Sequence, residues 1–363
     1  MRSVGILLVA CAAVLPALAQ EFYVVSAANS AVGGVYRLGL ADDGAFVQHG
    51  FTAVKTINYL IRHPRQPEYY YGTVERLPDG TRGGVAAFRR AANGDLALLA
   101  MVPTGGASSC HLALSPDGEF LYTANYGGAS ISELPMRDYL PQAGRVIAHS
   151  GGGPHKRQAG PHPHFVGFDP AGEHLLVPDL GLDRVLVYPW QAGVGVNADR
   201  VEHLSLAPGA GPRHAVFTAD GGTLYVANEL DGSVTSFVQR DGRWLRAYSV
   251  PAVRAEDIGT NYPGAIRLSA DERWLLVSNR GHNSIALLAT GPGGAMTLRD
   301  VAPSGGVNPR DLALSPGGDW LLVANDKSGT LARLRFDAAA GRLELVETTL
   351  SLPVVQAVLF CKP

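Results

Sequence analysis

The chain has 363 residues, 46% hydrophobic and 17% charged, so it is apolar enough to fold and too weakly charged to be disordered. Its formal net charge is −2 and no run of Lys or Arg reaches four residues. This excludes the basic patch that binding to nucleic acid requires. The 44 glycines and 24 prolines indicate many short strands joined by tight turns.

The first nineteen residues have the pattern of a secretory signal peptide. Arg2 supplies a positive start, residues 5–15 form an apolar region too short to span a bilayer, and Ala17-Leu18-Ala19 fits the cleavage motif. We therefore expect cleavage after Ala19, a secreted or periplasmic protein, and one domain over residues 20–363. Residues 8–11 also resemble a lipoprotein box, but too little apolar sequence precedes them. No later stretch is long enough for a membrane span.

Six segments of the mature chain share one pattern. Each has a strand of alternating apolar residues, a polar turn with Asp or Gly, and a more apolar second strand that usually ends on Asn. A third strand follows, and no helical period extends over a comparable length. The segments begin at Asn58, Cys110, Pro163, Pro212, Pro263 and Pro309. Their spacing of roughly 45 to 53 residues is that of a propeller blade.

The two ends of the mature chain are incomplete in complementary ways. Residues 22–40 have the pattern of a second and third strand without a first, and residues 352–360 that of a first strand alone. If these ends pair in one blade, the ring closes without an open sheet edge. We therefore predict an all-β, seven-bladed β-propeller closed by its N- and C-terminal strands. Cys110 and Cys361 then lie in non-adjacent blades, and we expect both to be free thiols.

The first strands of a propeller line its central channel. In each blade the start of the first strand lies beside the end of the second, at one mouth of this channel. One register of second-strand ends carries mostly Asn, which we expect to bond locally where the strand turns, with Asp179 the exception. The position one residue further along the chain carries acidic, aromatic and basic side chains in different blades, and this variety indicates a binding site. It holds Glu75, Tyr126, Leu180, Glu229, Arg280 and Asp326.

Three histidines occupy first-strand starts: His111, His164 and His214. A single such histidine is as often a hydrogen-bonded core residue, but the same mouth also collects arginines and glutamates, and buried charge is costly without a purpose. His162 and His164 share a strand face, yet no carboxylate cluster accompanies them, so we expect no metal and no cofactor. The remaining loop histidines are expected to be solvated. They are His149, His155, His174 and His203.

Several strings resemble the seven-bladed lactonases of the 6-phosphogluconolactonase type. They are residues 110–126, 162–170, 175–188, 211–230, 275–287 and 308–325. The resemblance implies hydrolysis of sugar lactones, and fungal relatives of this family close the lactone of a carboxylated muconate. Transferred position by position, the family's polar channel cluster falls on His111, His164, Asp179, Arg213, His214, Glu229 and Arg280, with Glu75.

The sequence departs from the family at two positions. Ala265 stands where many members have an acid, and Asp311 stands where an aromatic residue or His is common. A missing carboxylate would mean a shifted substrate, a relocated base or lost catalysis.

The resulting hypothesis is a monomeric, exported, metal-independent hydrolase of small aldonolactones. Glu229 beside His214 is the expected base, and Arg213 and Arg280 are the expected contacts to the carbonyl and its oxyanion. The residues expected to bind substrate are His111, His164, Asp179 and Glu75. The alternatives are a carboxymuconate-type lactonising cyclase and a non-catalytic binding propeller.

Overall fold

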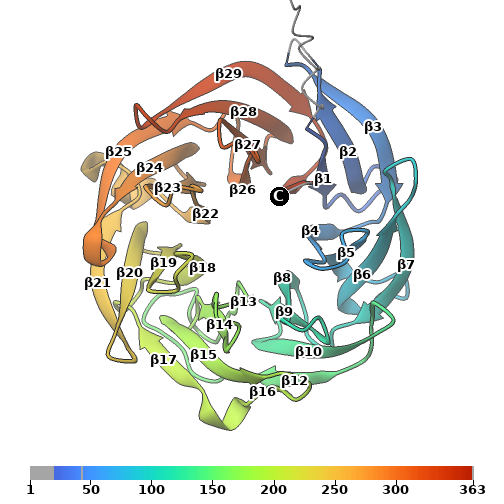
Figure 1. Ribbon diagram of the computed structural model, residues 1–363, viewed down its shortest axis with the longest axis horizontal. Coiled ribbons are helices and arrows are strands. Elements are labelled where there is room, and N and C mark those ends of the chain that lie inside the picture. Colours follow the sequence, from blue (N-terminus) through green and yellow to red (C-terminus); the bar gives the residue numbers. More distant parts are fainter. Residues whose placement is uncertain (1–19, 42–43, 362–363) are drawn as a thin grey trace, which may run out of the picture.

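The computed structural model describes residues 20–41 and 44–361. Over these residues the strands form seven sheets, which are arranged radially around a central channel (Figure 1). The predicted all-β, seven-bladed propeller is therefore confirmed. The expected signal peptide lies outside the described residues. Within them, we find no helix with the length and apolar character needed to cross a bilayer.

The sheet that contains both chain ends is called the closing blade, and the others are numbered 1 to 6 along the chain. From the channel outward, the closing blade holds β30 (Val355–Phe360), β1 (Phe22–Ser26), β2 (Gly34–Leu40) and β3 (Phe46–Ala53). Blade 1 holds β4 (Ile57–Arg62), β5 (Tyr69–Arg76), β6 (Arg82–Arg90) and β7 (Leu96–Pro103). Blade 2 holds β8 (Ser109–Leu114), β9 (Phe120–Asn125), β10 (Ser130–Arg137), β11 (Leu140–Pro141) and β12 (Arg145–Ala148).

Blade 3 holds β13 (Gly167–Phe168), β14 (His174–Asp179), β15 (Arg184–Gln191), β16 (Gly195–Val196) and β17 (Glu202–Ser205). Blade 4 holds β18 (Pro212–Phe217), β19 (Thr223–Asn228), β20 (Ser233–Arg240) and β21 (Arg243–Pro251). Blade 5 holds β22 (Pro263–Leu268), β23 (Trp274–Asn279), β24 (Ser284–Thr290) and β25 (Met296–Pro303). Blade 6 holds β26 (Pro309–Leu314), β27 (Trp320–Asn325), β28 (Thr330–Asp337) and β29 (Arg342–Ser351). Three short 3-10 helices lie between strands: η1 (Ala198–Arg200), η2 (Ala255–Thr260) and η3 (Pro292–Gly294).

The first strand of blade 3 is shorter than the repeat predicts. The ladder there consists of the two residues of β13 and a single bridge between Pro163 and Asp179. His164 lies between these two pairings and is buried. The interruption therefore places His164 in an irregular segment of the channel wall.

The hairpin turn between the first and second strands is built by a Ser-Pro-Asp-Gly sequence in blade 2. The Ser115 hydroxyl donates to Asp117, and the same carboxylate accepts the backbone N–H of Glu119 at 3.0 Å. Gly118 has a φ of 80°, which a residue with a Cβ rarely adopts. The turn fixes the hairpin register, so it also fixes which second-strand residues reach the channel mouth.

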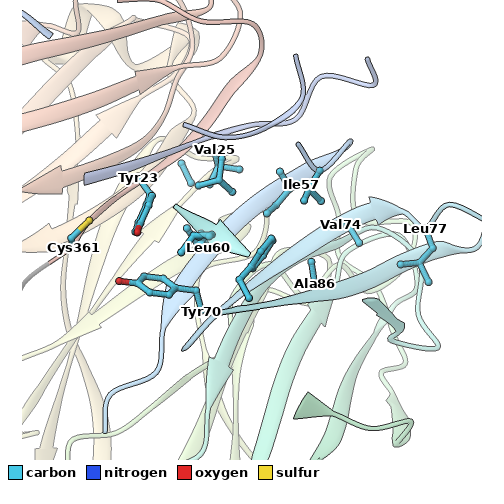
Figure 2. Packing of buried hydrophobic residues seen from close by; sticks show 14 residues of the cluster. Tyr23, Val25, Ile57, Leu60, Tyr70, Val74, Leu77, Ala86 and Cys361 are labelled. Carbon is cyan, nitrogen blue, oxygen red and sulfur yellow. The ribbon is translucent and has the colours of Figure 1, made fainter. Parts of the chain in front are cut away.

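The ring closes as the two chain ends predict. Strand β1 pairs antiparallel with β30, from Phe22 opposite Phe360 to Ser26 opposite Val355. Around this seam Tyr23 and Val25 of the closing blade pack with Ile57 and Tyr70 of blade 1 (Figure 2). Because both chain ends contribute to a buried cluster, closure is held by apolar burial as well as by the ladder.

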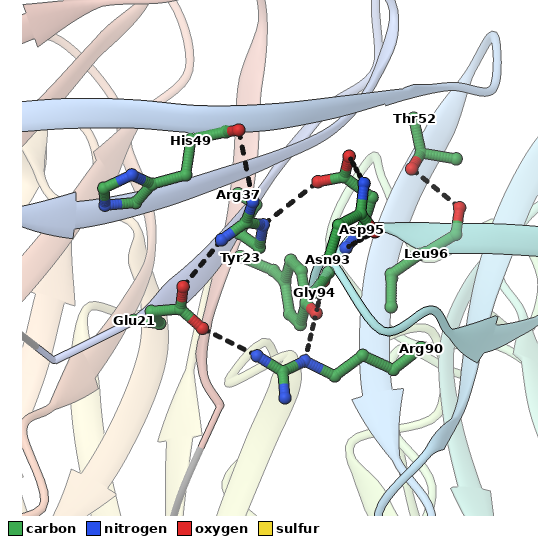
Figure 3. A network of polar contacts seen from close by, with 10 residues as sticks. All are labelled: Glu21, Tyr23, Arg37, His49, Thr52, Arg90, Asn93, Gly94, Asp95 and Leu96. Atoms are coloured by element: carbon green, nitrogen blue, oxygen red, sulfur yellow. Dashed lines mark hydrogen bonds and ion pairs between the residues drawn. The ribbon is translucent and has the colours of Figure 1, made fainter.

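A polar network on the same seam ties the first described residues to blade 1 (Figure 3). Glu21 accepts from Arg37 of β2 and Arg90 of β6, each at 2.6 Å. Arg37 also donates to Asp95, at 3.0 Å, in the turn before β7. The network thus joins the closing blade to its neighbour through the two carboxylates of Glu21 and Asp95.

The two mature cysteines are free, as expected. Cys110 lies on β8 of blade 2, and Cys361 follows β30 of the closing blade. Blade 1 separates the two sheets.

Candidate active site

A cavity of about 280 Å³ lies at the mouth where first strands begin and second strands end. Residues from six blades line it, together with one residue from the loop that joins blades 2 and 3. The lining residues are Asn58, Glu75, Ser108, Cys110, Tyr126, Arg157, His164, Glu229, Arg280 and Arg310. The expected convergence of positions far apart in sequence is thus present at this mouth. Of the predicted site residues, Glu75, His164, Glu229 and Arg280 line the cavity directly.

Glu229 is the centre of a cluster of three arginines. Its Oε2 lies 2.5 Å from Arg280 Nη2 and 3.2 Å from Arg213 Nε, and its Oε1 lies 2.6 Å from Arg157 Nη1. Its side chain is 3% exposed. Burial alone would raise the pKa of the Glu229 carboxyl, but Arg280 and Arg213 hold it well below its ordinary value.

This geometry does not fit the expected role of Glu229 as general base. Both oxygens of the Glu229 carboxylate are engaged by guanidiniums, so neither is free to accept a proton from water. None of its ion pairs involves His214, the expected partner. Glu229 instead holds the arginines in fixed positions.

Arg213 is on β18, with 1% of its surface exposed, and contacts Glu229 without itself lining the cavity. Its Nη1 has no hydrogen-bond partner among the described residues. Burial, with Arg280 and Arg310 nearby, lowers the pKa of Arg213, yet arginine stays protonated in proteins. A buried donor without an acceptor is costly, so this atom is prepared for an oxygen that arrives with a ligand or water.

His164 is the histidine of the three that reaches the cavity. Its Nδ1 lies 3.8 Å from Cys110 Sγ, and its ring contacts those of Tyr126 and His214. Burial first, and then the charge of Arg213, lowers the pKa of His164 well below 6.5. Its imidazole is therefore neutral at pH 7 and can accept a proton.

His111 and His214 lie deeper than the sequence suggested. The His111 ring packs between Tyr59 and Phe165, at centroid distances of 4.4 and 4.3 Å, and burial lowers its pKa to about 3. His214 contacts the rings of both other histidines, and its Nδ1 has no partner among the described residues. Neither lines the cavity. The lining residues therefore do not support the expected contact of His111 with substrate. Both rings instead pack below the residues that line the cavity.

Asp179 also does not line the cavity, contrary to its expected role in substrate binding. Its fully buried carboxylate accepts from His149 Nδ1 at 2.7 Å and from the backbone N–H groups of His162, at 2.7 Å, and Gly181, at 3.0 Å. It therefore anchors both ends of the loop at 149–162. His149, expected to be solvated, is buried and also accepts a hydrogen bond from Tyr188.

The asparagines at the same register act locally, as predicted. All four are fully buried at the ends of their second strands. Their amide nitrogens donate to hydroxyl groups or carbonyls at the start of the next strand or in the loop beside it. They are Asn125, Asn228, Asn279 and Asn325. In blade 3 the equivalent position holds Asp179 instead of asparagine. Its carboxylate accepts a hydrogen bond from His149 Nδ1, whereas the NH2 group of an asparagine would place one donor against another.

The loop at 149–162 supplies a site residue that sequence reasoning missed. Arg157 donates to Glu229 and, at 3.1 Å, to the Tyr126 hydroxyl. Tyr126 in turn stacks on His162, with ring centroids 4.5 Å apart. The next residue, Gln158, is buried and donates to Asp183 at 2.6 Å, which fixes the loop. The signal available in the sequence was the length of this loop, since long ordered loops are often functional.

Glu75 and Arg310 occupy the remaining sides of the mouth. Glu75 is at the rim, 36% exposed, and pairs with Arg82 at 2.8 Å. Arg310 is half-buried at the start of β26. Within the described part of the chain its guanidinium makes no hydrogen bond or ion pair, although it lines the cavity. The sequence did not single it out for a role.

The two positions that depart from the family lie away from this cavity. Ala265 is fully buried, and its backbone N–H donates to Ser278 at 2.8 Å. Asp311 pairs with Arg267 at 2.8 Å in a second, largely apolar-walled cavity of about 470 Å³, which also includes Tyr59. Neither departure removes a group from the arginine cluster.

No group of three or more His, Cys, Asp or Glu side chains in the described ranges is arranged to hold a metal ion. The cavity instead offers guanidinium donors, one neutral imidazole and a neutral thiol, since burial raises the pKa of Cys110 to about 11. Such a set polarises a carbonyl oxygen and accepts a proton.

Comparison with known proteins gives a consistent result. Residues 21–360 match the family model described as lactonase, 7-bladed beta-propeller. A 6-phosphogluconolactonase of Bacillus subtilis is 32% identical over 77% of this chain and 81% of its own. The periplasmic gluconolactonase of Pseudomonas aeruginosa superposes with a TM-score of 0.85 at 29% identity, covering 94% of this chain and 98% of that one. A putative 6-phosphogluconolactonase of Bacteroides fragilis also superposes with a TM-score of 0.85, at 27% identity over 95% and 99%. The chain therefore belongs to the seven-bladed β-propeller lactonase family.

Proposed function

We propose that this protein is an exported hydrolase of sugar lactones of the aldonolactone type, and that it needs no metal. The observation that carries the proposal is the pair Arg213 and Arg280, held by one buried carboxylate beside the neutral imidazole of His164. The names of the Bacillus and Pseudomonas relatives support the same class of reaction.

In the proposed mechanism the lactone carbonyl oxygen accepts hydrogen bonds from Arg280 and Arg213. His164 removes a proton from water as the water oxygen attacks the carbonyl carbon. The guanidiniums hold the resulting oxyanion, and Glu229 keeps them in place. When the tetrahedral intermediate collapses, the ring C–O bond breaks and the imidazolium returns its proton to the departing alkoxide. The products are a hydroxyl group and a carboxylic acid, which then ionises.

The proposal replaces the base expected from the sequence. Glu229 is too strongly stabilised as an anion, whereas His164 is neutral and lines the cavity. A lactone is already a reactive ester, so a weak base and two hydrogen-bond donors to the oxyanion are enough to lower the activation barrier for its hydrolysis. Each kind of group contributes roughly a hundredfold or more in enzymes.

The test is loss of glucono-1,5-lactone, followed at constant pH, above its spontaneous rate. Arg213→Ala should lower kcat/KM by about a hundredfold or more. Incubation with carboxymuconate tests the alternative cyclase, which the excess of arginines over carboxylates would suit. Consumption of neither compound would leave a binding propeller and reject the hydrolase.

Export is part of the proposal and rests on the N-terminal pattern and on the periplasmic relative. Mass spectrometry of the mature protein should find Gln20 as its first residue. An intact Met1 in the exported fraction would contradict cleavage.

A further inference from the structure

The cavity carries more positive charge than lactone hydrolysis requires. Three guanidiniums line it, those of Arg157, Arg280 and Arg310, together with the two carboxylates of Glu75 and Glu229. A fourth guanidinium, that of Arg213, contacts Glu229 without lining the cavity. One carboxylate, Glu75, is already paired with Arg82 at the rim. The neutral His164 and Cys110 add no charge. The transition state of the proposed reaction develops a single negative charge, so at least one guanidinium is unaccounted for.

Arg310 is that guanidinium. The other three contact Glu229, whereas Arg310 has no partner within the described residues. It lies close enough to Arg213 and His164 for its charge to oppose the protonation of each. Repulsion between the buried guanidinium of Arg213 and the half-buried one of Arg310 is unfavourable and is relieved when an anion binds between them.

We propose that Arg310 binds a carboxylate substituent of the substrate, so that the preferred substrate is a sugar lactone carrying a second acid group, the lactone of a sugar diacid. This inference rests on the proposed function and names its substrate class. Arg310 is the second residue of the first strand of blade 6, and Arg280 directly follows the second strand of blade 5. One ligand can therefore place its lactone carbonyl at Arg280 and its acid group at Arg310.

A carboxylate fits this position better than a phosphate. The planar fork of one guanidinium matches the two oxygens of one carboxylate. A phosphate monoester carries nearly two charges and three acceptor oxygens, but Arg310 is the single lining cation that the described contacts leave unpaired. The cavity, about 280 Å³, has the size for a small ring with a short substituent.

The test compares matched lactones with wild type and Arg310→Gln. Glucaro-1,4-lactone has a carboxylate where glucono-1,4-lactone has a hydroxymethyl group. Wild type should prefer the former, and Arg310→Gln should lower its kcat/KM by roughly ten- to a hundredfold more than that of the neutral lactone, the usual effect of losing a charge-assisted bond. Arg299→Gln, which removes an exposed arginine on the outer strand β25, is the control.

Three results would overturn the inference. They are an equal loss for both lactones in Arg310→Gln, the same selective loss in Arg299→Gln, or a stronger preference for 6-phosphoglucono-1,5-lactone that depends on Arg310. Calorimetric binding of the open-chain products separates this inference from the proposed function. Wild type should bind glucarate more tightly than gluconate, and Arg310→Gln should remove the difference. If no lactone is hydrolysed but this preference is found, the hydrolase proposal fails and the carboxylate site stands.

Discussion

Replacing Glu229 by glutamine tests whether that residue organises the site or acts as its base. The glutamate presents Oε2 to Arg280 and Arg213 and Oε1 to Arg157. Glutamine has one oxygen and one NH2 group, so whichever way it is oriented, a donor faces a guanidinium donor. Glu229→Gln therefore loses one side of the cluster and leaves buried cations without their counter-charge.

The size of the effect follows from burial. The side chains of Glu229 and Arg213 are 3% and 2% exposed, so solvent hardly screens them, whereas Arg157 is 38% exposed and its pair must be discounted. Removing one partner from a buried pair typically costs about 3–5 kcal/mol. We therefore expect Glu229→Gln to reduce the free energy of unfolding by about 3 kcal/mol and to lower kcat/KM at every pH.

The assays are urea unfolding followed by fluorescence, and lactone hydrolysis across pH 5–8. Glu75→Gln is the matched control, because it breaks a glutamate–arginine pair that is 36% and 56% exposed and should cost less than about 1 kcal/mol. Equal unfolding midpoints for the two variants would refute the organising role. Loss of activity with unchanged stability and an altered pH profile would restore Glu229 as the base.

Three further predictions address the base, the buried histidines and the ring. His164→Gln should lower kcat about a hundredfold. Wild-type kcat should not fall as the pH is lowered from 7.5 through 6.5, because the pKa of His164 lies well below its ordinary value, and an inflection near 6.5 would contradict this role. The folded pKa of His111, about 3, lies below its unfolded value, so its contribution to stability is present above pH 6.5 and is lost as the pH falls toward 3. As the pH is lowered over this range, His111 should reduce the free energy of unfolding by up to about 1.4 kcal/mol per pH unit. Urea titrations at several pH values should show a smaller dependence on pH for His111→Phe. Deleting residues 350–363 should prevent folding, because it removes β30 from its pairing with β1, and a soluble product with an unchanged melting temperature would contradict this.

The fold was predictable because each blade repeats one local pattern. Alternating apolar residues define the strands, and sequences such as Ser115-Pro116-Asp117-Gly118 define the turns. Closure was also predictable, since the truncated ends complement each other. The broken first strand of blade 3 was not foreseen, and the proline at its start does not signal it, because β18, β22 and β26 also begin with proline and have six residues each.

The site was predictable only at the positions that the strand pattern fixes. Glu229 and Arg280 directly follow second strands, and His164 lies in the segment before β13, so the repeat places them at the mouth. Cys110 and Arg310 occupy the bulge position of their first strands, and both line the cavity. His111 lies one residue further along β8 and does not line it, so its grouping with His164 in one register was wrong. Arg157 escaped notice because a loop supplies it, and no repeat relates that loop to another blade.

Asp179 shows why a residue's type does not establish its role. A carboxylate at a position otherwise occupied by asparagine suggested a ligand contact, yet its partners are His149 and the backbone of His162. Those contacts set the ends of the loop that carries Arg157 to Glu229. Asp179 thus affects the cavity indirectly, through the position of the loop that carries Arg157. Replacing it would alter the arginine cluster without removing any group that touches the cavity, which distinguishes a residue that supports the site from one that forms it.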